Sequence, residues 1–174
     1  VLGAYAITQF GTKKQKEKYL PQIVNGKITT AVAVDESSHH NPVNSEMKAS
    51  IKDDKYVLEG KKTFVVDGAS ADLLIVLVRT SGNPGDETGL SLFIVDSNEE
   101  GVSKIKLDMA DSRNYANIIF SNVSISKDQL LGDAESGGET IERILDIGRI
   151  AMSAEMLGNA EAAFETTLEY LKQR

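Results

Sequence analysis

The sequence of 174 residues is 41% hydrophobic and 26% charged, which is ordinary for a folded protein and unlike a disordered chain. Its 19 Lys and Arg against 26 Asp and Glu give a net charge of -7, which repels phosphates, so nucleic-acid binding is not expected. The lack of cysteine excludes disulfides and thiolate metal sites, and the longest apolar run, residues 73–78, is too short for a membrane helix.

Two helical segments are predicted at the start of the chain. Apolar residues between Leu2 and Phe10 have helical spacing, as if the chain began within a helix. Thr12 and Gln15 have the spacing of a capping box, which predicts a second helix that Pro21 ends or redirects. The lysines after Thr12 are interpreted as the solvated face of this second helix.

A run of short strands is predicted from residue 28 onward, because apolar residues now alternate or cluster between turn residues. The expected strands are residues 29–34, 47–51, 55–58, 63–66, 73–80, 90–95, 102–106 and 117–125. Asp53 and Asp54 have hairpin spacing between two of them. Since no helix interrupts the run, parallel βαβ units are disfavoured and an antiparallel β-barrel or sandwich is expected.

One long helix is predicted at the end of the chain. Ser136 and Glu139 have capping-box spacing, and apolar residues then recur at helical intervals up to Arg174 without a stop signal. We therefore expect a segment of a longer protein, with further helices after Arg174 that cover this one. Without them, we expect self-association through Leu157, Phe164 and Leu171.

The predicted fold class is thus α+β, with helices on both sides of a middle β-domain. The expected boundaries are residues 1–27, 28–131 and 132–174. Common nucleotide-binding, zinc-protease and nucleophile-elbow motifs are absent. The neighbouring His39 and His40 are interpreted as loop residues, because neighbours on an extended segment point to opposite faces, and no metal site is predicted.

Four blocks in the chain resemble sequence motifs of the acyl-CoA dehydrogenase family. Residues 10–21 resemble F-G-T-x-x-Q-K-x-x-Y-L-P, and residues 60–76 resemble G-x-K-x-W-I-T-N-G followed by A-D-x-x-x-V. Residues 120–132 resemble F-x-x-V-x-V-P-x-x-x-x-L-G, and residues 145–149 resemble L-x-x-G-R. The blocks occur in the family's order, so the chain is identified as a member.

The resemblance implies a subunit with an N-terminal helical domain, a central β-domain and a C-terminal four-helix domain, in a homo-oligomer or beside a paralogous subunit. It also implies a reaction in which a carboxylate removes the α-proton of an acyl-CoA thioester while the β-hydrogen leaves as hydride to FAD. An electron-transfer flavoprotein then takes the electrons. The implied compartment is the cytoplasm, or the mitochondrial matrix in a eukaryote.

The resemblance places the flavin contacts on five residues: Val32, Val34, Asp35, Phe64 and Val66. Asp35 replaces a threonine of the family, and its charge opposes an electron-rich reduced flavin unless it is protonated or paired. Val66 replaces a second threonine and cannot donate a hydrogen bond. Phe64 keeps an aromatic ring that stacks on the flavin, although a strand phenylalanine is equally expected in a core.

On the substrate side, the resemblance points to Asn41, Asp146 and Arg149. Asp146 and Arg149 also have the spacing of a surface ion pair on a helix. Gly148 occupies the position where one branch of the family carries its catalytic glutamate, so the base is expected beyond Arg174.

Two functions remain open at this stage. The first is a working FAD-dependent acyl-CoA dehydrogenase with divergent flavin contacts, and the second is a non-catalytic or scaffolding member that has lost them. Related chemistry, such as that of an acyl-CoA oxidase, is a further option. In every case the segment alone is expected to be inactive.

Overall fold

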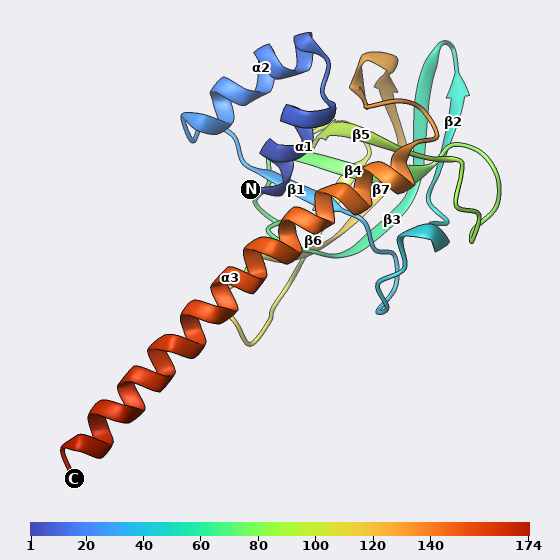
Figure 1. Cartoon of the computed structure of the whole chain (residues 1–174). Coiled ribbons are helices and arrows are strands. Elements are labelled where there is room, and N and C mark those ends of the chain that lie inside the picture. The colour runs from blue at the N-terminus through green and yellow to red at the C-terminus, as the bar shows by residue number, and fades with distance from the viewer.

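The computed structural model describes residues 1–174, and two helices begin the chain (Figure 1). Helix α1 spans Leu2–Phe10 and helix α2 spans Lys13–Val24. The predicted capping box is confirmed, because the Thr12 hydroxyl accepts the Gln15 N–H at 3.2 Å and the Gln15 side chain accepts the Thr12 N–H at 2.9 Å. The expectation that Pro21 ends α2 was wrong. Pro21 lies in the last turn and the helix continues past it, because a proline removes only the one hydrogen bond of its own missing N–H, while its carbonyl still accepts the N–H of Asn25 at 3.1 Å.

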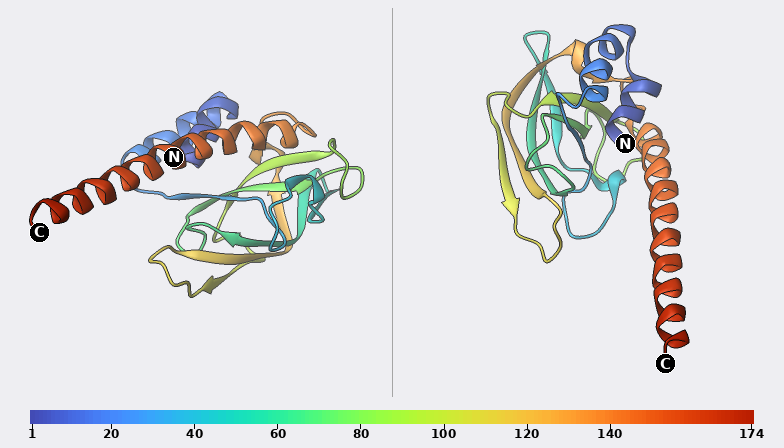
Figure 2. Two further views of the ribbon diagram at one scale, coloured as in Figure 1. Left: turned by 60° about the horizontal axis from the view of Figure 1, so that its bottom comes forward. Right: turned by 90° about the vertical axis from the view of Figure 1, so that its left-hand side faces the viewer.

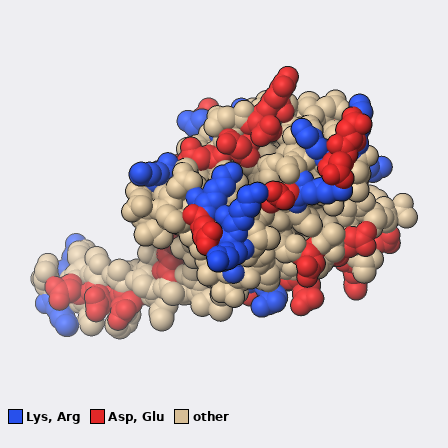
Figure 3. Space-filling view, turned by 90° about the horizontal axis from the view of Figure 1, so that it is seen from above, with Lys and Arg blue, Asp and Glu red and all other residues tan.

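The lysines of α2 lie on a solvated surface, as the sequence indicates. Lys14 forms an exposed ion pair with Asp128 at 2.7 Å. Viewed from above, basic and acidic side chains are interspersed over the molecule (Figure 3). The lysines of α2 therefore belong to a surface of mixed charge in this view.

Eight strands form one sheet. They are β1 (Thr30–Ala33), β2 (Lys48–Lys52), β3 (Lys55–Val65), β4 (Leu73–Arg79), β5 (Leu90–Asp96), β6 (Val102–Leu107), β7 (Tyr115–Ser126) and β8 (Leu130–Leu131). Their order is β6-β7-β3-β2-β4-β5-β8, and β1 pairs with β4. The two strands predicted at 55–58 and 63–66 are a single strand, β3, whose pairing with β7 shifts register twice.

The sheet is mainly antiparallel, as predicted, but β1 runs parallel to β4 and β2 meets β4 in a parallel contact. Because the β2–β3 hairpin lies between β1 and β4 in the chain, the parallel pair forms without a crossover helix. Asp53 and Asp54 make the turn of this hairpin with φ values of 49° and 61°, which is the conformation that two-residue hairpin turns need.

The predicted α+β class is confirmed. The sheet is not closed, because its two end strands, β6 and β8, do not pair with each other. Its halves face each other across an apolar core. In this core the Tyr56 ring of β3 meets the Phe93 ring of β5 with centroids 4.8 Å apart. The packing is therefore that of a sandwich made from one bent sheet.

Helices α1 and α2 and the start of helix α3 (Gly137–Lys172) cover one outer face of the sheet (Figure 2). Ile7 of α1 and Ile141 of helix α3 pack with Ile75 and Leu92 of the sheet in a second apolar cluster. Burial of side chains of this size stabilises the fold by roughly 1.5–3 kcal/mol each. This second layer also sets the distance between α3 and β1.

The buried or partly buried residues of helix α3 end at Gly148, so only its first three turns pack on the body. The rest projects away from the sheet (Figure 1). The predicted capping role of Ser136 was wrong: its φ and ψ are -95° and 6°, and its hydroxyl donates to the carbonyl of Asp133. None of the helices combines the length and the apolar character that crossing a bilayer requires.

Candidate functional site

A cavity of about 540 Å³ lies between the sheet and α3. Its walls come from β1, the end of β3, and the middle of α3, with Leu2 of α1 at one side. All five residues predicted as flavin contacts line it: Val32, Val34, Asp35, Phe64 and Val66. The structure therefore brings together side chains from two segments that lie about 30 residues apart in the chain.

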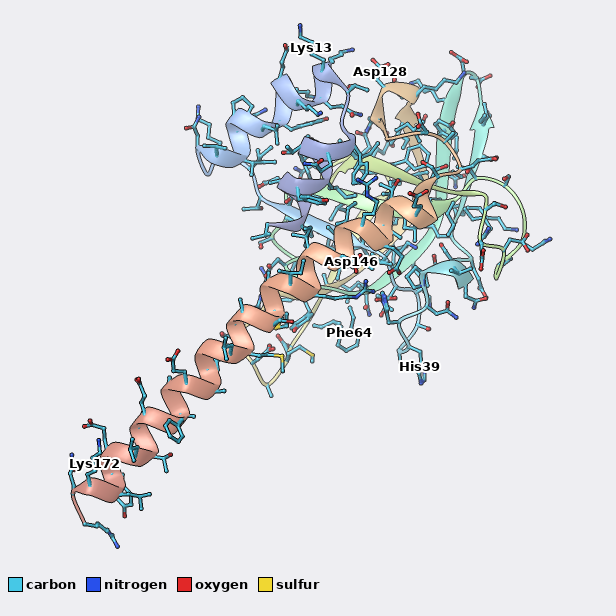
Figure 4. All side chains as sticks on the ribbon, viewed as in Figure 1. Lys13, His39, Phe64, Asp128, Asp146 and Lys172 are labelled. Atoms are coloured by element: carbon cyan, nitrogen blue, oxygen red, sulfur yellow. The ribbon has the colours of Figure 1, made fainter.

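Phe64 stands at the rim of this cavity, close to α3 (Figure 4). It lies in an irregular part of β3 with φ of 52°, where its N–H donates to the Asn117 side chain at 3.2 Å. Its side chain is 49% exposed and meets the ring of Tyr115 only edge-on, at 6.0 Å between centroids. Phe64 is therefore not a core residue, and its ring is available to a ligand.

The backbone around Val34 and Asp35 is fixed by a buried lysine. Lys62 is fully buried, and its ammonium donates to the carbonyl of Val34 at 2.9 Å and to Glu36 at 2.6 Å. The N–H of Thr63 donates to the carbonyl of Asp35 at 2.7 Å. These bonds join the two walls of the cavity, the segment after β1 and the end of β3.

The Glu36 carboxylate is held ionised by its neighbours. Its burial opposes ionisation, but the Lys62 ammonium, the Ser45 hydroxyl and the N–H of Glu46 together keep its pKa below the usual value. Burial lowers the pKa of Lys62, while the adjacent carboxylate works in the opposite direction. Glu36 also accepts the N–H of Met47, so the pair fixes the whole loop between β1 and β2.

Asp35 is paired in the structure. The Nδ1 atom of His40 lies 2.9 Å and 3.0 Å from the two carboxylate oxygens of Asp35. His40 also lines the cavity. The resemblance indicated that the charge of Asp35 opposes a reduced flavin unless Asp35 is protonated or paired, but it did not identify His40, which was interpreted only as a loop residue.

Of the three predicted substrate residues, the structure brings Asp146 and Arg149 together and leaves Asn41 apart. Asn41 lines a separate polar cavity beside His39 and Glu46. Arg149 lines a shallow neighbouring cavity that shares Leu145 and Gly148 with the one beside Phe64, and Asp146 lines neither. Their predicted alternative role is confirmed, since Arg149 pairs with Asp146 at 2.6 Å on the exposed side of α3.

Sequence reasoning missed two buried cations near the site. One is Lys62, whose only signal was its place in the G-x-K block. The other is Arg79 of β4, which donates to the carbonyls of Val43, Ser45 and Thr88 at 2.6–3.0 Å. Arg79 thereby ties two loops to the sheet, and a charged residue at the end of an apolar strand was its only signal.

Comparison with known proteins agrees with this geometry. Residues 31–123 match the family model described as "Acyl-CoA dehydrogenase, middle domain". The 3-(aryl)acrylate reductase of Clostridium sporogenes is 36% identical over 94% of this chain and 44% of its own length. A subunit of the caffeyl-CoA reductase–Etf complex of Acetobacterium woodii is 30% identical over 94% of this chain and 44% of its own length.

The solved structure of butyryl-CoA dehydrogenase from Megasphaera elsdenii superposes with a TM-score of 0.92 and 33% identity. The match covers 99% of this chain and 46% of that one. The chain thus spans less than half the length of each of these three proteins.

Proposed function

The chain belongs to the acyl-CoA dehydrogenase family, and on this premise we propose that the protein carrying it is an FAD-dependent acyl-CoA dehydrogenase. It would remove hydrogen from the α and β carbons of an acyl-CoA thioester and pass the electrons to an electron-transfer flavoprotein. The observation that carries the proposal is that one cavity brings together Val32, Val34, Asp35, Phe64 and Val66.

The residues present fit the ring system of FAD. A cavity of about 540 Å³ is within the size range of ligand sites, and valine side chains with an accessible phenylalanine suit a flat aromatic ring. FAD, when bound, supplies the acceptor for the hydride of the β-carbon. Phe64 and Val66 would hold the ring from the β3 side, and Val32 and Val34 from the β1 side.

The other groups of the site have supporting tasks in this proposal. The apolar wall excludes water, which strengthens the polar contacts made inside the cavity. The Lys62–Glu36 pair fixes the positions of the two cavity walls relative to each other. Gly148 of α3 lines the cavity without a side chain and cannot act as the base, and we propose that the base that takes the α-proton lies beyond Arg174.

We retain the substrate-side assignment of Asp146 and Arg149 as part of the proposal, with Asn41 as a more distant contact. We also propose domain boundaries at residues 1–27, 28–131 and 132–174, and an oligomer formed with copies of itself or with a paralogous subunit. The proposed compartment is the cytoplasm, or the mitochondrial matrix in a eukaryote.

The similarity to two reductases favours a second candidate, the reverse reaction, in which an α,β-unsaturated aryl or acyl thioester is reduced. The same cavity would serve both directions, because the bonds formed in one direction are those broken in the other. A third candidate is a non-catalytic subunit, which the replacement of two hydroxyl donors by Asp35 and Val66 favours.

An absorption experiment separates the three candidates. The purified full-length protein is mixed without oxygen with a panel of saturated acyl-CoA thioesters, and the visible flavin band is followed. Bleaching by one thioester supports the dehydrogenase. A chemically reduced sample whose band returns only with an enoyl-CoA supports the reductase, and a protein with no flavin band after incubation with excess FAD supports the non-catalytic subunit.

A further inference from the structure

Arg113 is the only lysine or arginine whose side chain lines the cavity beside Phe64. It lies between β6 and β7, two residues before Tyr115, whose ring meets the ring of Phe64 at the rim of the cavity. The side chain of Arg113 is 48% exposed, so it is open to a ligand. The wall that presents the accessible aromatic ring therefore also presents a permanent positive charge.

The backbone around Arg113 is fixed, whereas its guanidinium group is not. The N–H of Arg113 donates to the Asp111 carboxylate at 3.1 Å, and the side-chain amide of Asn114 donates to the Ser70 hydroxyl at 2.7 Å. The guanidinium donates no hydrogen bond, and its only ion-pair partner is Glu155 of α3 at 4.0 Å. A contact of this length between two half-exposed side chains contributes little free energy, so a better acceptor can displace Glu155.

The acidic side chains of the cavity lining make this arginine the favoured place for an anion. They are Asp35, Asp67 and Glu155, and only Asp35 has a histidine partner. A negatively charged part of a ligand is repelled near these carboxylates and attracted beside Arg113. The planar guanidinium binds phosphate oxygens through two parallel N–H donors, which a single carboxylate oxygen at 4.0 Å does not use.

We propose that Arg113 binds the pyrophosphate of FAD and leaves Glu155 when the cofactor enters the cavity. The inference rests on the proposed function, because it needs FAD in this cavity. The flexible ribityl chain of FAD joins the ring to the pyrophosphate, so a ring that packs on Phe64 can have its phosphates along the same wall. Arg113 is thereby a cofactor-binding residue, and Glu155 is the group that competes with the cofactor for it.

This competition predicts opposite effects for the two members of the ion pair. Removing the charge of Arg113 weakens FAD binding, because a charge-assisted contact is lost. Removing the charge of Glu155 strengthens FAD binding, because the competing partner and a repelling charge are lost together. An ion pair that only held α3 against the sheet would behave differently, since loss of either partner would break the same contact and weaken binding.

The test uses the full-length protein stripped of FAD, with FAD, riboflavin and CoA as separate ligands. Riboflavin has the ring and the ribityl chain of FAD but no phosphate, so it measures the contacts to the ring alone. The variants are Arg113→Gln and Glu155→Gln, with Lys106→Gln as the matched control. Lys106 is an exposed cation of β6 that does not line the cavity. Flavin affinity is measured by fluorescence quenching, CoA affinity by calorimetry and folding by the urea midpoint.

Arg113→Gln is expected to bind FAD roughly tenfold more weakly than the wild type and to bind riboflavin equally well. Glu155→Gln is expected to bind FAD more tightly. Lys106→Gln is expected to keep the FAD affinity of the wild type, and the urea midpoints of all variants are expected to agree. Added salt is expected to weaken FAD binding more in the wild type than in Arg113→Gln, because salt screens the contact that the variant lacks.

Three results would overturn the role of Arg113. Equal weakening of FAD and riboflavin binding in Arg113→Gln would trace the loss to the ring site or to the fold. Weaker FAD binding in Glu155→Gln would show an ion pair that only maintains the shape of the cavity. Unchanged FAD binding with weaker CoA binding in Arg113→Gln would assign the arginine to the phosphates of CoA. A wild type that binds neither flavin would instead overturn the proposed function, and this inference with it.

Discussion

Lys62 and Glu36 form an ion pair inside the fold, with Nζ 2.6 Å from Oε1 and the lysine fully buried. The pair lies directly behind the cavity, because Lys62 also holds the carbonyl of Val34. A buried pair of this kind adds little net stability compared with apolar residues, but removing one partner leaves the other charge buried without a partner. The pair therefore makes the geometry of the cavity wall sensitive to single substitutions.

Lys62→Met is expected to destabilise the protein by about 3 kcal/mol, the lower end of the range for a broken buried pair. Glu36 keeps its bonds from the Ser45 hydroxyl and the N–H groups of Glu46 and Met47, which limits the loss. Urea unfolding measures the change. The double variant Lys62→Met with Glu36→Gln is expected to lose less free energy of unfolding than the two single variants lose in sum. Strict additivity of the two losses would show that the pair does not act as a unit.

The pair also predicts a pH dependence of stability. The pKa of Glu36 is lower in the folded protein than its usual value of 4.5, so its ionised form favours folding. This contribution is fully present above about pH 4.5 and is lost as the pH falls through the folded-state pKa. Between pH 7 and pH 3, the free energy of unfolding measured with urea is expected to fall more steeply in the wild type than in Glu36→Gln. Parallel curves for the two proteins would contradict this role of Glu36.

Phe64 is expected to matter for the ligand and little for the fold. Because its side chain is 49% exposed, Phe64→Ala is expected to lower stability by about 1 kcal/mol or less. The matched variant is Phe120→Ala in the buried core, where about 3–5 kcal/mol is expected. FAD affinity of the full-length protein is expected to fall several-fold in Phe64→Ala. An unchanged affinity would show that the Phe64 ring does not contact FAD.

The projecting part of α3 is expected to associate with other copies when the 174-residue chain is prepared alone. Leu157, Phe164 and Leu171 are each more than 60% exposed there. Replacing all three with glutamate is expected to give a monomer, because the apolar contact area is lost. Light scattering over a range of concentrations measures the mass, and a wild-type chain that stays monomeric at high concentration would contradict the expectation.

The order of helices and strands was predictable from local patterns. Alternation of apolar residues located the strands, and the Asp53–Asp54 pair located the hairpin turn. The break in β3 at Phe64 was not predictable, because it depends on the Asn117 side chain of a strand more than 50 residues away. The sequence instead predicted a gap at residues 59–62, because Gly60 indicates a turn, whereas β3 continues through these residues.

The cavity was predictable only through the family resemblance, which grouped five residues from two segments. The burial of Lys62 was not, since a lysine in a strand is usually solvated and its partner Glu36 lies 26 residues away. The Asp35–His40 pair was not predicted, because the charge of Asp35 left protonation and pairing as equal alternatives. The loop geometry that supplies His40 has no local sequence signal.

The most direct test of the account is the amount of FAD bound per subunit of the full-length protein when the cavity is filled. Val66→Trp places a large side chain in the cavity from a position that is 44% exposed, so folding is expected to survive. Val24→Trp, at the exposed end of α2 and outside the cavity, is the matched control. The account predicts one FAD per subunit in the wild type and the control and none in Val66→Trp, and a full FAD complement in the filled variant would contradict it.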